Sequence, residues 1–462
     1  MPRKPQPTKP PRAIGRAVTA LRRRRIPAAV RVIVSLLVLV LIGTGLLWVS
    51  GVGTPQRLTF QEALFTAVSA LAVTGLSTIT PSTDLTFFGQ VVLMALIQIG
   101  GIGFMVLAVA VLRALRRQVS LFDRQALRDS LGLSEAVEFR TVLRRVLMSM
   151  LAVESVGALL LWLHWRSTLG NETAAFYGLF HAVSAFCNAG FSLFSPAQYP
   201  AGIPRDTVSL AILGGLIVCG GLGFPVLADL VEWPTRRRLS LHARLTIIVS
   251  AILIATGAIG LLLAENRSGG ALNGVPWHEQ IVLSAFQSIS TRTAGFSVMA
   301  SLQELTAASQ VLLTGLMFIG TAPASMGGGI TTGTFIVLAL AMWSYARGLR
   351  SVQVQKRQIP ADAVRRASAV LLVALLVVIG ATWMILLEQP APLDDVAFEV
   401  VSAFSTTGLS LNYTTQLSIF GQYIIMLCML WGRLGALTIV VALGEQRPPE
   451  RVEYPEERLL LG

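Results

Sequence analysis

Four segments of the chain repeat one pattern: a phenylalanine, a run of mostly small residues, a glycine and, two residues later, a serine. They read Phe65-Thr-Ala-Val-Ser-Ala-Leu-Ala-Val-Thr-Gly75-Leu-Ser77, Phe180-His-Ala-Val-Ser-Ala-Phe-Cys-Asn-Ala-Gly190-Phe-Ser192, Phe286-Gln-Ser-Ile-Ser-Thr-Arg-Thr-Ala-Gly295-Phe-Ser297 and Phe398-Glu-Val-Val-Ser-Ala-Phe-Ser-Thr-Thr-Gly408-Leu-Ser410. The glycines recur after 115, 105 and 113 residues, and the third segment is one residue shorter before its glycine. Internal repeats of this kind decide the fold, so the chain is predicted to contain four copies of one unit.

The composition places these units in a membrane. A chain of 462 residues would suggest about three soluble domains at roughly 150 residues each. However, 53% of the residues are hydrophobic and only 13% are charged, whereas soluble domains carry about 25% charged residues. So few charges cannot cover a water-soluble surface, but they suffice if lipid covers most of it. The chain is predicted to be an integral membrane protein.

Cysteines and histidines exclude other classes of site. The three cysteines lie far apart, at positions 187, 219 and 428, so neither a disulfide framework nor a zinc pattern is present in the sequence. The four histidines are not paired at the spacing of metal ligands. No phosphate-binding glycine motif follows a strand pattern. The chain is therefore predicted not to be an enzyme and to carry no organic cofactor.

Eight apolar runs are long enough to be candidate membrane spans. They cover residues 32–49, 86–112, 146–165, 207–231, 246–264, 308–345, 367–387 and 417–443. The first run follows four arginines and would fit a signal peptide, but no small-residue cleavage site stands out after it. Between each odd-numbered span and the next lies a less apolar stretch of about 25–45 residues, with a predicted helix of 10–14 residues before the glycine. Helices of that length are too short to cross and fit re-entrant hairpins.

The distribution of basic residues predicts the orientation. Of the 37 lysines and arginines, 31 lie in the two termini and in the three connectors between units. Positive residues mark cytoplasmic segments, so both termini and the connectors are predicted to be cytoplasmic and the hairpins to enter from outside. The net charge of +13 then forms a one-sided collar suited to anionic lipids, and nucleic-acid binding is not expected.

This organisation divides the chain into seven parts. They are a basic cytoplasmic arm (1–31), a first pore repeat (32–112), a cytoplasmic connector (113–145), a second pore repeat (146–231), a third pore repeat with a gating loop (246–345), a fourth pore repeat (367–443) and a cytoplasmic tail (444–462). The predicted fold class is an all-α integral membrane protein, with four span–pore-helix–span repeats in pseudo-fourfold arrangement around one central pore.

The glycine turns suggest what the four units do together. Without a Cβ, glycine adopts backbone angles that turn carbonyl oxygens inward, and rings of carbonyl oxygens can replace the hydration shell of a cation. The alternative is that each glycine only permits close helix packing; four copies at equal positions favour the pore. The predicted filter residues, acting through backbone carbonyls, are Val73, Thr74, Gly75, Leu76, Asn188, Ala189, Gly190, Phe191, Thr293, Ala294, Gly295, Phe296, Thr406, Thr407, Gly408 and Leu409.

With these four stretches, the segment Trp431-Gly-Arg-Leu-Gly-Ala-Leu-Thr438 resembles the Trk/Ktr/HKT superfamily of potassium transporters. The tail Tyr454-Pro-Glu-Glu-Arg-Leu-Leu-Leu-Gly462 is similar to the ending of the KtrB branch. The resemblance covers residues 31–462 and implies a pore in each subunit, a homodimer and a cytosolic nucleotide-binding ring of the KtrA type. In the HKT branch a serine at the first filter glycine is associated with sodium; glycine at all four positions here favours potassium.

The sixth span carries a predicted gate. Its sequence Ile319-Gly-Thr-Ala-Pro-Ala-Ser-Met-Gly-Gly-Gly-Ile-Thr331 should interrupt helical hydrogen bonding, either as a mobile loop or as a static kink. By resemblance it is the family's gating loop, although the family's lysine after Gly-Gly-Ile is Thr331 here. Arg433, the one charge in the last span, resembles the family's pore arginine. The predicted gate residues are Gly320, Pro323, Ala324, Ser325, Met326, Gly327, Gly328, Gly329, Thr331 and Arg433.

The resulting hypothesis is a gated potassium-uptake subunit in a bacterial plasma membrane, with sodium as an activator or as a coupled ion. A secondary transporter of an organic solute would also use a broken helix, but its repeats would be inverted rather than parallel. A membrane scaffold would explain the basic connectors and leave the four glycines without a reason. Glu154, inside the third span, is predicted to form a structural hydrogen bond, with an ion site as the alternative.

Overall fold

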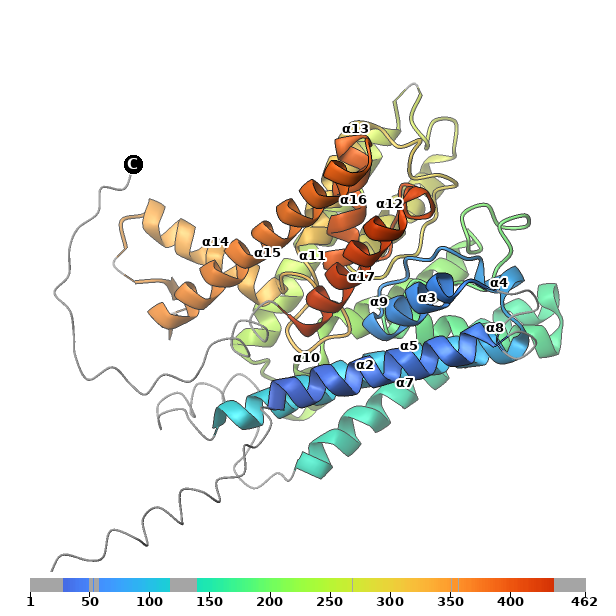
Figure 1. The fold of residues 1–462 in the computed structure, drawn as a ribbon. Helices are drawn as coiled ribbons and strands as arrows, with labels where there is room; N and C mark the ends of the chain where they lie inside the picture. Colours follow the sequence, from blue (N-terminus) through green and yellow to red (C-terminus); the bar gives the residue numbers. More distant parts are fainter. Residues whose placement is uncertain are drawn as a thin grey trace, which may run out of the picture.

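The computed structural model describes residues 28–49, 53, 58–116, 139–267, 269–349, 351–355 and 357–435. Most of the basic arm, residues 117–138 of the first connector, the end of the fourth repeat and the predicted tail lie outside the described residues. The described chain is almost entirely helical, and its elements follow one another as four successive units (Figure 1).

Each unit contains a long helix, a short helix and a second apolar helix. The first unit comprises α2 (Ala28–Trp48), α3 (Phe60–Ala72), the single turn α4 (Pro81–Asp84) and α5 (Phe87–Arg116). The second comprises α7 (Phe139–Leu169), α8 (Asn171–Phe186), α9 (Thr207–Leu222) and α10 (Phe224–Arg236). The third comprises α11 (Leu241–Glu265), α12 (Trp277–Thr291), α13 (Ala307–Phe318) and α14 (Thr332–Ala346). The fourth comprises α15 (Ala361–Glu388), α16 (Leu393–Phe404), the 3-10 turn η1 (Thr414–Gln416) and α17 (Ile419–Leu434).

The first of the short helices α3, α8, α12 and α16 begins at a local signal that the sequence carries. A capping box starts α3: Thr59 Oγ1 accepts the N–H of Glu62 at 3.2 Å, and the Glu62 carboxylate accepts the N–H of Thr59 at 2.8 Å. Helices α3 and α16 have 13 and 12 residues, within the predicted 10–14, whereas α8 has 16 and α12 has 15. Helix α8 is longer than predicted because it begins almost directly after α7: Gly170, with φ of 79°, is the single residue between the two helices.

Three described helices are long and apolar enough to cross a bilayer: Val146–Leu169, Leu241–Glu265 and Ala361–Glu388. A fourth candidate consists of α9 and α10 taken together, but their axes differ by 103°. The candidate span predicted over 207–231 therefore consists of two helices that meet at a sharp bend. Gly223 has φ of 79°, and the proline after Phe224 occupies the first turn of α10, where it starts a new helix because it has no N–H to continue the old one.

The sixth predicted span is also two helices. Helix α13 ends at Phe318 and α14 begins at Thr332; we call residues 319–331 between them the α13–α14 loop. Its two ends meet at a parallel bridge between Ile319 and Ile330, so the loop leaves the helical path and returns to it. The sequence predicted this interruption from its glycines and Pro323.

The units follow one another around a closed circle. Helix α5 of the first unit packs on α8 of the second, α9 of the second packs on α12 of the third, and α13 of the third packs on α16 of the fourth. Helix α17 of the fourth unit packs on α3 of the first and closes the circle. Figure 1 shows α17 (red) beside α3 (blue), although they stand near opposite ends of the chain. Each contact joins the second apolar helix of one unit to the short helix of the next.

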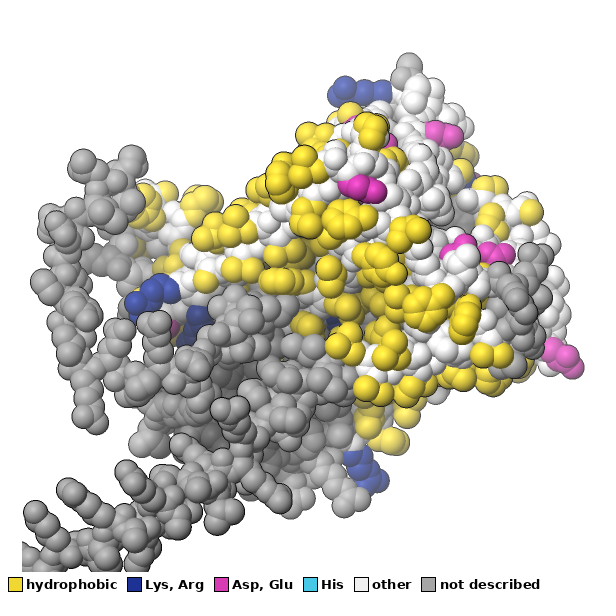
Figure 2. Space-filling view, in the orientation of Figure 1, with side chains coloured by type: hydrophobic (Ala, Val, Ile, Leu, Met, Phe, Trp, Pro, Cys, Tyr) yellow, Lys and Arg dark blue, Asp and Glu magenta, His cyan; other side chains and the backbone are white. Residues whose placement is uncertain are grey.

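The middle of the outer surface is apolar, as expected for a surface in contact with lipid. Figure 2 shows hydrophobic side chains spread over the face that carries α15 and α17, where Leu376 and Leu427 are exposed. One feature departs from the all-α prediction: β1 (Gln353–Val354) and β2 (Arg357–Gln358) form an antiparallel hairpin in the last connector. Arg244 donates a hydrogen bond of 3.1 Å to Gln355 of this hairpin, which ties two predicted cytoplasmic connectors together.

Candidate functional site

All four short helices end in the same way. The residue two positions before each repeated glycine has a left-handed conformation, with φ of 56° at Val73, 59° at Asn188, 64° at Thr293 and 50° at Thr406. The glycines follow with φ of 94°, 69°, 76° and 91°. Left-handed angles are uncommon for residues with a Cβ, above all for valine and threonine. Four equal departures therefore indicate one shared backbone shape, and we call residues 73–76, 188–191, 293–296 and 406–409 the four glycine segments.

The glycine segments form a closed ring. A Cβ on Gly75 would lie 2.3 Å from the carbonyl oxygen of Ala189, and one on Gly190 would lie 2.7 Å from that of Ala294. On Gly295 it would lie 2.4 Å from the oxygen of Thr407, and on Gly408 it would lie 2.1 Å from that of Thr74. Each glycine thus faces the carbonyl before the next glycine, in the order of the units. Only glycine fits at these four positions, because real Cβ atoms do not approach so closely.

The backbone of each segment is tied to its own short helix by a serine. The residue before the glycine donates its N–H to the carbonyl oxygen of this serine at 2.7–2.8 Å in every unit; the serines are Ser69, Ser184, Ser290 and Ser402. The hydroxyls add a second bond. Those of Ser69 and Ser402 accept the N–H of Gly75 and Gly408, both at 3.1 Å, and those of Ser184 and Ser290 donate to the carbonyls of Phe191 and Phe296.

The first three carbonyls of each glycine segment are left free for another partner. Within the part of the chain that the structure describes, the carbonyl oxygens of residues 73–75, 188–190, 293–295 and 406–408 accept no hydrogen bond. Carbonyls away from bulk water are nearly always paired, so a ring of free ones calls for a ligand. Carbonyl oxygens are ligands that replace the water around an alkali cation.

The serine two residues beyond each glycine turns the chain away from the ring. Its hydroxyl accepts the N–H two residues further on, from Ile79 at 3.3 Å, Phe194 at 3.1 Å, Met299 at 3.1 Å and Asn412 at 2.9 Å. These local serine turns explain why the sequence pattern continues past the glycine. The repeat therefore extends to hydrogen bonds as well as to backbone angles.

The α13–α14 loop lies against the inner end of this ring. A Cβ on Gly327 would lie 2.0 Å from the hydroxyl of Thr293, and Gly328 donates its N–H to the hydroxyl of Thr406 at 3.0 Å. A Cβ on Gly329 would approach the Cα of Ser405 to 3.1 Å. The three consecutive glycines thus contact the ends of the third and fourth short helices and the segments that follow them.

Two buried arginines hold the loop. Arg433 of α17 donates to the carbonyl oxygens of Met326 and, at 3.0 Å, of Gly100 in α5. Arg292 donates through Nη2 to the carbonyl oxygen of Gly320 at 3.0 Å and to the hydroxyl of Thr332 at 2.9 Å. One arginine therefore holds the middle of the loop and the other its base.

The loop also touches the break between α9 and α10. Ala322 and Met326 donate their N–H groups to the carbonyls of Gly221 and Gly220, at 3.0 and 3.2 Å. Phe224 donates its N–H to the carbonyl of Ala324 at 3.2 Å. Of the remaining predicted gate residues, Pro323 approaches Gly223, and Ser325 shares a hydrogen bond of 2.8 Å with Thr321. Thr331, the last residue of the loop, caps the start of α14.

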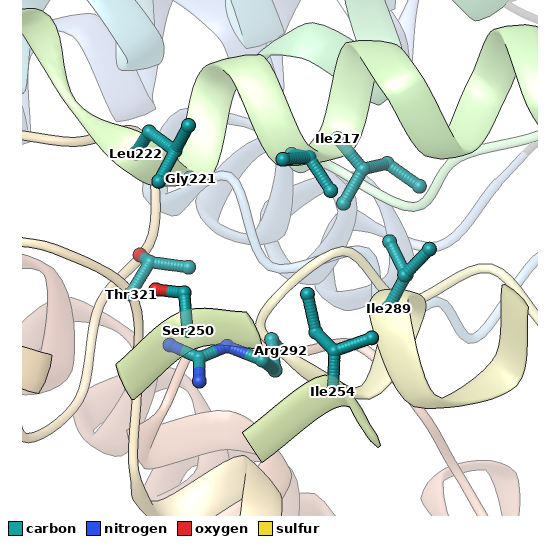
Figure 3. Close-up of a pocket in the computed structure, with 9 residues that line it drawn as sticks. Ile217, Gly221, Leu222, Ser250, Ile254, Ile289, Arg292 and Thr321 are labelled. Atoms are coloured by element: carbon teal, nitrogen blue, oxygen red, sulfur yellow. The ribbon is translucent and has the colours of Figure 1, made fainter. Parts of the chain in front are cut away.

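A small pocket opens beside the base of the loop, between α9, α11 and α12. Figure 3 shows the guanidinium of Arg292 on the side of this pocket that carries the hydroxyls of Ser250 and Thr321. The rest of the lining is mainly apolar, with Ile217 and Ile254 among it. Through its hydrogen bonds to Gly320 and Thr332, Arg292 joins the end of the third short helix to the base of the loop.

Glu154, the acidic residue that the sequence places inside the third span, has structural partners. Glu154 in α7 accepts a hydrogen bond of 2.9 Å from Gln98 in α5, and the thiol of Cys187 lies 3.8 Å from its other oxygen. Among the described residues, no group of three or more histidine, cysteine, aspartate or glutamate side chains is arranged to hold a metal ion. Reasoning from the sequence missed the bracing serines inside the short helices, although the repeat placed a serine at the same position in each.

This combination defines a class of protein: a membrane protein in which four helical units bring a ring of free carbonyls together above an interrupted helix. The chain belongs to the TrkH family of cation transport proteins, whose model matches residues 21–453. This is a family of transporters rather than of enzymes.

Individual relatives cover most of the chain. The potassium uptake protein B of the Ktr system of Vibrio alginolyticus is 33% identical, over 92% of each chain. The potassium uptake protein D of the Ktr system of Bacillus subtilis is 34% identical, over 87% of this chain and 90% of its own. The crystal structure of the potassium transporter TrkH from Vibrio parahaemolyticus matches 91% of this chain and 86% of its own with a TM-score of 0.72 at 17% identity, which shows a shared fold.

Proposed function

We propose that this chain is the membrane subunit of a bacterial potassium-uptake system and that potassium crosses the membrane through the ring of glycine segments. The single observation that carries the proposal is the closed ring, in which every glycine faces the carbonyl before the next glycine. Potassium uptake by the relatives of the Ktr system supports potassium as the ion. The free carbonyls of the four segments would take the place of its hydration shell.

The α13–α14 loop is proposed as the gate of this pathway. It lies next to the ring, on the side where the short helices end, and its glycines are held by hydrogen bonds rather than by a packed helix. Thr331 caps a helix here, so this gate needs no lysine of its own. Arg433 supplies the positive charge instead, and it would oppose a cation below the ring while it holds Met326.

The surroundings of the pathway complete the proposal. The distribution of basic residues supports a cytoplasmic location for both termini and the connectors, where they would contact anionic lipids. A second copy of the chain and a cytosolic nucleotide-binding ring of the KtrA type are the expected partners, and the names of the relatives, which describe parts of a Ktr system, support such an assembly. Sodium acts as an activator in this scheme.

The test is ion flux into proteoliposomes that contain the purified chain. We expect potassium uptake that exceeds sodium uptake, and reduced discrimination in Gly190→Ser and Gly408→Ser, because a side chain at either position displaces the facing carbonyl. Gly380→Ser in α15 is the matched control, since a Cβ there meets no atom within 4 Å. Absence of potassium flux, with and without the regulatory ring, would contradict the proposal. Uptake of an organic solute instead would favour the secondary transporter.

A deletion tests the gate separately. Removal of residues 324–329 should raise basal potassium flux, because the segment that lies against Thr293 and Thr406 is then gone. A folded deletion variant with unchanged or lower flux would assign the loop a structural role only. Adding sodium and nucleotide in turn to the wild-type chain with its regulatory ring tests the remaining parts of the proposal.

A further inference from the structure

One position in each short helix faces the chain that leaves the ring. It is the residue directly after the repeated phenylalanine, and it is polar and completely buried in all four units: Thr66, His181, Gln287 and Glu399. Buried polar side chains are rarely without a hydrogen-bonding reason. The four residues differ in size and charge, so this position is where the units stop being equivalent.

Three of these side chains make the same hydrogen bond. The N–H three residues beyond the glycine donates to His181 Nε2 from Leu193 at 3.3 Å, and to Gln287 Oε1 from Val298 at 3.1 Å. In the fourth unit Leu411 donates to Glu399 Oε1 at 3.1 Å. Thr66 is shorter, and its hydroxyl has no partner among the described residues. The position therefore fixes the backbone just outside the ring.

His181 and Gln287 accept this hydrogen bond as neutral side chains. His181 Nδ1 lies 2.8 Å from the carbonyl oxygen of Tyr177, which can only accept, so Nδ1 carries the proton. Its Nε2 lies 3.3 Å from the N–H of Leu193, which can only donate, and 3.0 Å from the hydroxyl of Ser192, which can donate as well as accept, so an unprotonated Nε2 satisfies both contacts. The ring is thus neutral. Gln287 is neutral by its chemistry, and its Nε2 has no hydrogen-bond partner in the described part of the chain.

Glu399 differs, because donors surround its carboxylate. Oε1 accepts from the hydroxyl of Ser410 and from the N–H groups of Leu411 and Tyr413, the latter at 3.3 Å. Oε2 accepts from the hydroxyl of Thr414 at 2.7 Å. Two of the four donors are backbone N–H groups that cannot reverse their role, and an ionised carboxylate is the side chain that only accepts. The cluster is built for a negative charge.

We propose that Glu399 is a positioning and affinity-setting residue for the transported cation, which rests on the proposed function of the ring. Its hydrogen bonds fix the chain that follows the fourth glycine segment. Its charge, buried away from water, attracts a cation that enters the ring from the side of Ser410. Because a charge acts further through protein than through water, the carboxylate need not touch the ion. The fourth unit would then bind the cation more strongly than its three neutral counterparts.

Moving the charge between equivalent positions tests this. Glu399→Gln keeps an acceptor for Leu411, as Gln287 does for Val298, and removes the charge; its amide nitrogen then faces the hydroxyl of Thr414, which can accept as well as donate. Gln287→Glu places a charge behind the third segment, where it replaces an amide whose Nε2 lacks a partner among the described residues. The double variant moves the charge from one segment to the next. Potassium uptake into proteoliposomes is measured against external potassium concentration for the wild type and the three variants, together with the ratio of potassium to sodium flux.

The expected result is a change in KM with the maximal rate changed much less. Glu399→Gln should raise KM for potassium about tenfold, the scale of one unit charge acting over several ångström in a medium of intermediate dielectric constant. Gln287→Glu should lower KM, and the double variant should return it toward the wild-type value. The flux ratio should stay unchanged, because neither substitution touches the segment carbonyls.

Two results would overturn the inference while leaving the proposed function intact. One is a wild-type KM in folded Glu399→Gln; the other is a double variant no better than Glu399→Gln. If Glu399→Gln does not fold, Gln287→Glu alone decides, since an unchanged KM there contradicts the role of charge. A wild-type chain without potassium flux would contradict the proposed function instead, so the two failures are distinguishable.

Discussion

Arg433 donates a hydrogen bond to the main-chain oxygen of Met326, 107 positions earlier in the sequence. The same guanidinium reaches Gly100 at 3.0 Å, so one side chain of the fourth unit joins the first unit to the α13–α14 loop of the third. Arg433 is almost completely buried. Because Arg433 binds a main-chain oxygen of the glycine-rich loop, it holds the loop in place through the loop's backbone.

Arg433→Gln should therefore release the loop and raise basal potassium flux. The shorter, neutral amide cannot span Met326 and Gly100 together, and each lost hydrogen bond from a charged donor costs about 1.5–3 kcal/mol. The measurement is the initial rate of potassium uptake into proteoliposomes at equal protein content. Arg267→Gln, on the exposed surface, is the control for loss of one positive charge. A rate equal to the wild type in folded Arg433→Gln would show that the loop is held without this arginine.

Close packing predicts a second effect, on stability. In three units a glycine of the second apolar helix lies against the carbonyl at the end of the short helix; a Cβ on Gly220 would stand 1.9 Å from the oxygen of Phe186. Gly220→Ala should lower stability by about 1–3 kcal/mol or more, since backbone atoms must move apart. Thermal unfolding of the purified protein in detergent measures the change.

The control for this substitution lies one turn away. A Cβ on Gly215, also in α9, meets no atom within 4 Å, and alanine favours a helix over glycine by about 1 kcal/mol. Gly215→Ala should thus be neutral or stabilising. If the two variants unfolded at the same temperature, close approach at Gly220 would not be what holds α9 against α8.

Much of the ring could be predicted from the sequence, because the four glycines occupy equivalent positions in a repeated pattern. The pattern placed Gly75 and Gly408 at the same position of two units, and the interruption near Gly327 followed from consecutive glycines and a proline. These features depend on local backbone preference, which follows directly from the residue types. Membership of a cation-transport family followed from the same residues.

What the sequence could not give depends on contacts between distant units. Gly223 reads as one more glycine in an apolar run, yet α9 ends there and the proline after Phe224 starts α10, with the carbonyls of Pro323 and Ala324 beside the break. The repeat likewise showed where Glu399 lies, but the sequence did not indicate what its side chain does. Its partners lie 11–15 residues further on, in a turn whose shape only the structure shows.

The break at Gly223 predicts that α10 and the loop are coupled. Gly223 has φ of 79° and ψ of 156°, a region that only glycine adopts readily, and a Cβ there would lie 2.9 Å from the oxygen of Pro323. Gly223→Ala should displace the loop and raise potassium flux while the flux ratio to sodium stays unchanged, because the glycine segments are not touched. Gly348→Ala also replaces a glycine of positive φ, 69°, but has open space around it, and should leave flux unaltered. A lower flux ratio in Gly223→Ala would place the effect in the ring rather than in the loop.

Ser402 provides the sharpest test of the bracing of the ring. Its hydroxyl accepts the N–H of Gly408 at 3.1 Å, and its carbonyl accepts that of Thr407 at 2.8 Å. Ser402→Ala removes the first bond and leaves a buried N–H without an acceptor, at a cost of about 1–3 kcal/mol. The fourth segment should then loosen, with a lower melting temperature and a lower ratio of potassium to sodium flux. Ser284→Ala is the matched control, since that buried hydroxyl has no partner among the described residues and its loss should be neutral or stabilising. An unchanged flux ratio in Ser402→Ala, with the melting temperature lowered as expected, would separate stability from selectivity and show that the carbonyl of Thr407 is held by the backbone bond alone.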